Sequence, residues 1–206
     1  MRYFINEQLI RIFFSAHLLW ILTFAWMTKQ EISFGERVFR IYLDETQIQT
    51  RIRELAAEIQ EQYRNTELVI VSVLNGAFMF TADLLRKLDI PCNLNFIRVS
   101  SYSGTETTGQ VKTVMGLGDN MAGKHILLIE DIVDTGITLK ELLRQLQVEE
   151  PASIRVCSLL VKPEKHLVPV NVDYPGFVIP DAFVVGYGLD LDGQGRNLPH
   201  IYQLKS

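Results

Sequence analysis

Hydrophobic residues along this chain form two patterns: in some segments they recur at helical spacing, and in others they form short continuous runs. Between Asp44 and Tyr63 apolar residues recur about every 3.6 positions, and Asp44 can act as a helix N-cap. The β-branched run Leu68–Leu74 is typical of a strand buried on both faces. The same patterns predict further helices over 78–88 and 137–146, and strands over 93–100, 125–130, 154–161 and 183–187. This alternation predicts an α/β fold with a mostly parallel central sheet flanked by helices.

An apolar stretch from Leu9 to Trp26 stands outside this pattern. It has about the length of a membrane span, but Arg11 and His17 would be costly inside a bilayer. A secretory signal would end in a small-residue cleavage site, which is missing here. From Met27 the chain reads like the start of a soluble protein. We therefore expect residues 1–26 to be an extension upstream of the true start, with a membrane anchor as the alternative, and residues 27–206 to form one domain.

Composition narrows the class of protein further. With 206 residues, 48% of them hydrophobic and 21% charged, the chain is an ordinary globular protein. Its formal net charge of −4 argues against a nucleic-acid partner, which would require a basic face. Cys92 and Cys157 lie far apart and form no metal-binding spacing. Two free thiols indicate a reducing compartment, so we expect a cytoplasmic protein.

Three carboxylates gather where the strand predicted over 125–130 ends. Glu130, Asp131 and Asp134 repel one another at such spacing unless a cation or a polyhydroxyl ligand lies between them. The segment Asp134–Thr138 then supplies hydroxyls, a glycine and free N–H groups at a helix N-terminus, which suits a phosphate. The alternative is a plain turn in which Asp134 and Thr135 only cap the helix. An acidic pair followed by a phosphate cradle favours a ribose phosphate.

A second glycine segment, Gly118–His125, approaches the spacing of a P-loop. His125 replaces the Ser or Thr that would hold Mg²⁺, and the segment precedes a strand where a P-loop would join strand to helix. We interpret it as a turn leading into the strand.

The carboxylate segment resembles the signature of the type I phosphoribosyltransferases. The resemblance implies that family's fold, with a small hood region beside the sheet, and a substrate, 5-phosphoribosyl-1-pyrophosphate. Carried over by position, the residues that bind its ribose and 5′-phosphate are Glu130, Asp131, Asp134, Thr135, Gly136, Ile137 and Thr138.

Further segments in the same order, across 35–203, are similar to the hypoxanthine(-guanine) branch of that family. Taken alone, Lys162 would be a solvated lysine at a strand end and Phe183 a core residue. The resemblance instead implies that Lys162 donates to the purine O6, Phe183 stacks on the base and Val184 contacts it through its backbone. It also implies that Asp190 helps to hold a second Mg²⁺ ion through water.

The resemblance assigns three more roles. Pyrophosphate would be bound by Leu74, Asn75, Gly76 and Arg196, with a non-proline cis peptide between Leu74 and Asn75. Many relatives have a basic residue at position 75, so a side-chain charge contact there is in doubt. Ser101 and Tyr102 would belong to a lid that excludes water, Asp134 would be the general base, and Mg²⁺ would be held by Glu130, Asp131 and Asp190.

The implied function is purine salvage. The enzyme would transfer the phosphoribosyl group to hypoxanthine, and to guanine, giving IMP or GMP and pyrophosphate, and it would form a homodimer or homotetramer. Three alternatives stay open: a non-catalytic sensor of phosphoribosyl pyrophosphate, a membrane-tethered salvage enzyme, and a xanthine-preferring enzyme. Retention of Asp134, Lys162 and Arg196 favours an enzyme over the sensor.

Overall fold

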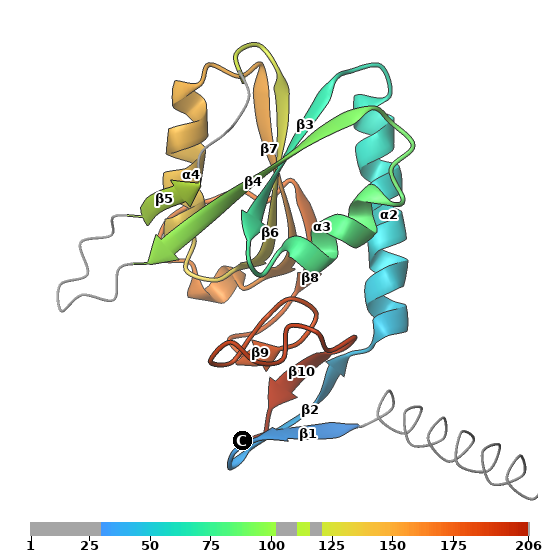
Figure 1. Cartoon of the computed structure of the whole chain (residues 1–206), viewed down its shortest axis with the longest axis vertical. Helices are drawn as coiled ribbons and strands as arrows, with labels where there is room; N and C mark the ends of the chain where they lie inside the picture. The colour runs from blue at the N-terminus through green and yellow to red at the C-terminus, as the bar shows by residue number, and fades with distance from the viewer. Residues whose placement is uncertain (1–29, 102–110, 116–120, 206) are drawn as a thin grey trace, which may run out of the picture.

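The structure is a computed structural model that describes residues 30–101, 111–115 and 121–205 (Figure 1). The apolar segment 1–26 lies outside these residues. No helix within the described part of the chain combines the length and the apolar character needed to cross a membrane.

A six-stranded sheet forms the body of the molecule, in the order β5-β4-β3-β6-β7-β8. Its strands are β3 (Leu68–Leu74), β4 (Cys92–Ser101), β5 (Val111–Met115), β6 (His125–Val133), β7 (Ser153–Val161) and β8 (Tyr174–Val178). All neighbours pair in parallel except β5, which runs antiparallel to β4. The predicted mostly parallel sheet is therefore confirmed.

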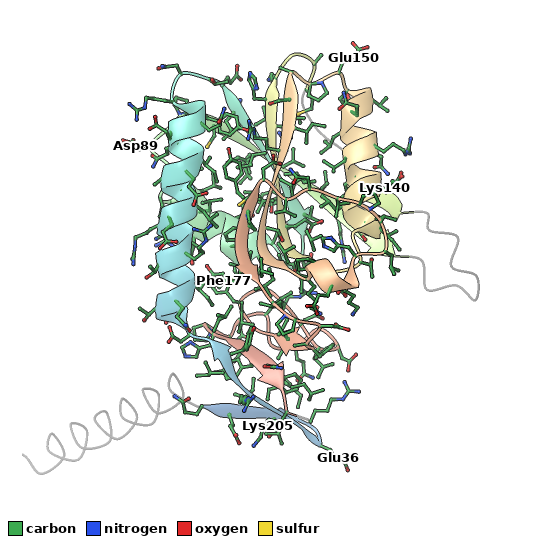
Figure 2. All side chains as sticks on the ribbon, turned by 180° about the vertical axis from the view of Figure 1, so that it is seen from behind. Glu36, Asp89, Lys140, Glu150, Phe177 and Lys205 are labelled. Atoms are coloured by element: carbon green, nitrogen blue, oxygen red, sulfur yellow. The ribbon has the colours of Figure 1, made fainter. Side chains whose placement is uncertain are left out.

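Helices cover both faces of this sheet (Figure 1). On one face lie α2 (Glu45–Tyr63) and α3 (Phe78–Leu85), whose buried side chains join those of the strands in one core cluster. Phe177 of β8 packs against the same cluster (Figure 2). On the other face α4 (Ile137–Val148) buries Leu139, Leu142 and Leu146 in a second cluster.

The start of α2 shows why this helix could be predicted from local sequence. The Asp44 carboxylate accepts from the Gln47 backbone N–H at 2.8 Å, and the Gln47 side chain accepts from the Asp44 N–H at 2.9 Å. This reciprocal capping satisfies two N–H groups that would otherwise lack partners.

A smaller antiparallel sheet, in the order β1-β2-β10-β9, forms the hood. Its strands are β1 (Glu31–Phe34), β2 (Arg37–Leu43), β9 (Val184–Val185) and β10 (Ile201–Leu204). Figure 1 shows this sheet beyond the carboxyl ends of the parallel strands, so loops from both sheets face the space between them.

Three predicted elements differ from the structure. The strand expected to end at Glu130 continues to Val133, because Ile132 and Val133 still pair with β7. The helix expected over 78–88 ends at Leu85 and continues only as a turn. The strand expected over 183–187 shrinks to Val184–Val185 and pairs antiparallel with β10 in the hood.

The parallel strand β8 was missed because its sequence contains Pro175 and Gly176. Pro is tolerated there because β8 is an edge strand and pairs with β7 alone. Gly176 is needed because a Cβ atom at this position would overlap the carbonyl oxygen of Leu159 in β7.

Candidate active site

The predicted site residues of the central motif lie at the carboxyl end of β6. Glu130 and Asp131 are part of the strand itself and do not follow it as expected, while Asp134 begins the loop to α4. Because β3 and β7 pair with β6 in parallel, the loops that follow all three strands meet at the same edge of the sheet.

Both strand carboxyls are taken out of water. Burial, and then the neighbouring Asp131 carboxylate, raise the pKa of Glu130 well above its usual range. Burial raises the pKa of Asp131 to about 6, although backbone N–H groups and the Arg196 guanidinium oppose this shift. One of those N–H groups belongs to Ile132, which donates to the Asp131 carboxylate at 2.9 Å. Ionising both Glu130 and Asp131 therefore costs free energy unless a cation lies beside them.

Gly76 brings the loop after β3 against the Asp131 carboxylate. A Cβ atom at position 76 would overlap Asp131 Oδ2, so only glycine permits this approach. The peptide bond between Leu74 and Asn75 is cis, as the resemblance implied. The exposed Asn75 and buried Gly76 therefore lie beside Asp131 at one point of the site.

Arg196 ties the glycine-rich loop to Asp190. Its guanidinium lies 2.6 Å from Asp190 Oδ1 and donates to the Gly188 carbonyl at 2.6 Å. The second Asp190 oxygen accepts from the Gly193 backbone N–H at 2.7 Å. Without ligand, the positive charge predicted to contact pyrophosphate is thus held by a carboxylate of the same site.

The carboxylates suit Mg²⁺ that arrives with a phosphorylated substrate. Within the described residues, no three His, Cys, Asp or Glu side chains form a ready metal cage. Mg²⁺ commonly takes only one or two protein carboxylates, together with water and substrate phosphates. Burial is the main cause that raises the pKa of both Glu130 and Asp131, and the carboxylates of Asp131 and of Asp190, respectively, raise them further. The donor set of Glu130, Asp131 and Asp190 therefore fits the ion.

The loop from β6 to α4 leaves helix N–H groups free for an anion. The N-cap of α4 is Gly136, in the left-handed conformation with φ 80°, and no side chain caps the helix. Only a long 3.5 Å contact joins Thr135 Oγ1 to the Ile137 N–H. The interpretation of Asp134 as a mere helix cap is therefore wrong. A small cavity of about 80 Å³ lies here, lined by Glu130, Ile132, Val133, Asp134, Thr135, Gly136, Thr138 and Leu139.

Lys162 lies at the end of β7 and faces Asp134. Its side chain is buried, with the residue only 5% exposed, so the interpretation as a solvated lysine is wrong. Its ammonium nitrogen lies 3.6 Å from Asp134 Oδ1 and 3.4 Å from Asp181 Oδ1. The structure thus places the predicted base-recognition lysine beside the predicted general base.

Phe183 lies on the surface beside the hood sheet and not in the core. The residue is 46% exposed, and its ring contacts Phe39 with centroids 6.1 Å apart. One side of the ring is therefore supported while much of it stays accessible. Val184 beside it is buried in β9. Of the predicted lid, Ser101 ends β4 and its side chain is not described, while Tyr102 lies outside the described residues.

Two further pairs were missed from the sequence. Lys165 and Asp181 complete an ion-pair cluster with Lys162 and Asp134. In the second pair, the Tyr187 hydroxyl donates to Asp83 of α3 at 2.5 Å. Burial, and then this hydrogen bond, raise the pKa of Tyr187. Of these contacts, the sequence gives a signal only for the two lysines, because Lys162 and Lys165 stand three positions apart.

Comparison with known proteins agrees with this geometry. A family model described as the phosphoribosyl transferase domain matches residues 40–192. The chain is 44% identical over 167 residues to the hypoxanthine-guanine-xanthine phosphoribosyltransferase of Tritrichomonas foetus, covering 81% of this chain and 91% of that relative. It is 43% identical over 164 residues to the hypoxanthine phosphoribosyltransferase of Salmonella typhimurium, covering 78% and 92%.

Solved structures show the same architecture. A crystal structure of a hypoxanthine-guanine phosphoribosyltransferase from Bacillus anthracis, with a HEPES molecule in its active site, matches with a TM-score of 0.77. The two chains are 40% identical, and the match covers 80% of this chain and 98% of that one.

Proposed function

The chain belongs to the hypoxanthine(-guanine) phosphoribosyltransferases of the phosphoribosyltransferase family, and from this premise we propose how its site performs purine salvage. It is a pentosyltransferase. In the proposed reaction, N9 of a 6-oxopurine attacks C1′ of 5-phosphoribosyl-1-pyrophosphate, and the bond from C1′ to the pyrophosphate oxygen breaks. The products are the purine nucleoside 5′-monophosphate and pyrophosphate, and the base loses one proton.

One observation carries this assignment to the 6-oxopurines. A buried lysine, Lys162, lies 3.6 Å from Asp134, although the two residues follow different strands, β7 and β6. An ammonium group is a hydrogen-bond donor only. It can therefore donate to the oxygen of a 6-oxopurine, but it cannot accept a hydrogen bond from the amino group of adenine. A carboxylate next to it can take the proton that leaves N7 of the same ring.

Base binding and proton transfer follow from this pair. Lys162 donates to O6 and Phe183 stacks on the purine, with its other side against Phe39. Asp134 takes the N7 proton as the bond from N9 to C1′ forms. The reacting carbon develops oxocarbenium character, while negative charge grows on the departing pyrophosphate.

Groups from two loops stabilise that departing charge. Arg196 exchanges its ion pair with Asp190 for a contact with pyrophosphate, and backbone N–H groups near Asn75 donate to the same oxygens. Bound Mg²⁺, held by Glu130, Asp131 and Asp190, would neutralise pyrophosphate charge. The N–H groups at the start of α4 bind the 5′-phosphate.

A panel of bases tests the proposal. With phosphoribosyl pyrophosphate and Mg²⁺, we expect turnover of hypoxanthine and guanine and negligible turnover of adenine, with xanthine included to measure its share. Appreciable adenine turnover would contradict the role of Lys162. Full turnover in the presence of a chelator would contradict the metal requirement.

The domain limits and the assembly are also proposals. Every described site residue lies after residue 30, so we expect a chain that starts at Met27 to retain full turnover. Mass spectrometry of the native N-terminus, with cell fractionation, tests the start site and the proposed cytoplasmic location. Light scattering tests the proposed homodimer or homotetramer.

A further inference from the structure

Four charged side chains close a ring beside the base position. Lys162 lies 3.6 Å from Asp134 and 3.4 Å from Asp181, and Lys165 lies 3.2 Å from each of the same two carboxylates. We call Asp134, Lys162, Asp181 and Lys165 the charge ring. Each lysine therefore contacts both aspartates.

Local backbone geometry explains why the two lysines act together. They stand three positions apart around the short 3-10 helix η1 (Pro163–Lys165), and the Lys165 N–H donates to the Lys162 carbonyl at 3.0 Å. Side chains three apart in a 3-10 helix lie above one another. Pro163 fixes φ at the first helical position, and the ion pairs show that both ammonium groups lie against the same two carboxylates.

The two lysines use separate oxygens of Asp134. Lys162 faces Oδ1, and Lys165 faces Oδ2. Oδ1 is buried and forms no hydrogen bond with the described residues, so its only close charge there is Lys162. When Lys162 donates to a purine O6, Asp134 retains Lys165 and keeps Oδ1 free for a proton from N7.

Asp181 has the opposite effect on base binding, because it competes with the purine O6 for Lys162. Its Oδ1 lies 3.4 Å from the Lys162 ammonium and 3.2 Å from the Lys165 ammonium. Because Lys165 neutralises part of the Asp181 charge, Asp181 holds Lys162 less strongly. The hydrogen bond from Lys165 is the main cause that lowers the pKa of Asp181, ahead of the bond from Lys162. Lys165 is thus the principal partner of Asp181.

We propose that Lys165 is a positioning residue for base binding, which keeps Asp134 in place and keeps Asp181 from retaining Lys162. This inference rests on the proposed roles of Lys162 and Asp134. Lys165 itself touches neither the base nor the phosphoribosyl group. The Lys165 side chain is 37% exposed, and ion pairs at that exposure add little to the free energy of unfolding. Removing the Lys165 ammonium should therefore lower activity and leave stability nearly unchanged.

Lys165→Met tests the inference. We expect the KM for hypoxanthine to rise about tenfold and kcat to fall, because both carboxylates then hold Lys162 and Asp134 loses its anchor. The KM for phosphoribosyl pyrophosphate and the thermal midpoint should change little. Lys165→Arg, which keeps both ion pairs, should restore most of the activity.

Two controls make the test specific. Lys205 pairs with Glu31 at 2.8 Å on the hood surface, so Lys205→Met removes a comparable pair away from the ring and should leave the kinetics unchanged. Adding Asp181→Asn to Lys165→Met removes the negative charge of one of the two carboxylates that face Lys162 and should lower the raised hypoxanthine KM, while kcat stays low. A merely structural role for Lys165 predicts no such recovery.

The outcomes separate this inference from the proposed function. If Lys165→Met matches the wild type, or if both substrates lose affinity equally, Lys165 has no positioning role. If the wild-type enzyme itself does not turn over hypoxanthine, the proposed function fails first, and the lysine variants are then compared for hypoxanthine binding by calorimetry. Equal affinities there would overturn the inference as well.

Discussion

The backbone of Gly188 lies against that of Gly76, so closely that a Cβ atom at position 188 would overlap the Gly76 carbonyl oxygen. Gly76 in turn lies against the Asp131 carboxylate. Three segments far apart in the chain, one after β3, one in β6 and one after β9, therefore meet at these two glycines. The carboxylates and the predicted pyrophosphate loop are held in place by this contact.

Gly188→Ala should disrupt the site and the fold together. The residue has φ 98°, and the added methyl group would strike backbone, which cannot move aside as a side chain can. We expect a loss of about 3 kcal/mol in the free energy of unfolding and loss of turnover. Gly123→Ala is the matched control, because φ there is 70° but no atom of the described residues lies within 4 Å of the added Cβ. That variant should lose only about 1 kcal/mol and keep its activity. Equal losses in urea unfolding would show that the contact with Gly76 is unimportant.

Tyr187→Phe should destabilise the loop that carries Gly188. The Tyr187 hydroxyl donates to Asp83 at 2.5 Å, and Gln49 also donates to that carboxylate. Removing the hydroxyl deprives a partly buried carboxylate of a donor, at a cost of about 2 kcal/mol. Tyr63→Phe provides the comparison, since the buried Tyr63 hydroxyl donates to no carboxylate within the described part of the chain. Thermal unfolding should therefore separate the two variants, and a smaller loss for Tyr187→Phe than for Tyr63→Phe would contradict this account.

Local sequence was sufficient for the elements whose causes are local. The capping of α2 by Asp44 and the buried run of β3 depend on neighbouring residues, and both were predicted with the bounds that the structure has. The carboxylates of β6 could also be predicted as a site, because three acidic residues beside a buried strand have no structural reason. Their presence also hid the true end of β6, since carboxylates are unusual inside a buried strand.

Long-range contacts account for what the sequence could not predict. Asp83 and Tyr187 are 104 positions apart, and no local pattern in either segment marks them as partners. Asp181 joins the charge ring only because the loop before β9 returns to the end of β7. The hood strands β1 and β10 have four residues each, too few for a clear alternation, and the burial of β2 does not alternate strictly along its seven residues, so none of the three was predicted.

Asp134→Asn should separate catalysis from substrate binding. The amide keeps the shape of the side chain but cannot take the N7 proton, so kcat should fall by roughly 10²–10⁴-fold. The KM for phosphoribosyl pyrophosphate should change less than about threefold, because helix N–H groups bind the phosphate. Asp89→Asn is the control, an exposed residue beyond α3 and away from the site (Figure 2). A rise in that KM with kcat unchanged would assign Asp134 to binding instead.

Asp131 should make the ligand-free protein less stable as pH rises. Burial raises the pKa of Asp131 from 3.8 to about 6, so between these values the folded state retains a proton that the unfolded state has lost. The free energy of unfolding must therefore fall as pH increases through this window. The shift corresponds to roughly 3 kcal/mol, fully expressed above pH 6.

Asp131→Asn should remove the part of this dependence that Asp131 contributes, while burial of Glu130, which raises the pKa of that carboxyl, keeps a part of its own. In urea unfolding with a chelator present, the variant should be more stable than the wild type at pH 7.5 and similar to it at pH 4.5. Glu141→Gln serves as control, because hydrogen bonds from Arg144 and Gln145 lower the pKa of Glu141 from 4.5 to about 2, so Glu141 changes stability in the opposite direction and mainly below this window. The asparagine variant should also lose turnover, since the charge that destabilises the empty site is the one that the metal and ribose require. A variant that is no more stable than the wild type at pH 7.5 would show that the Asp131 carboxylate is not under this strain.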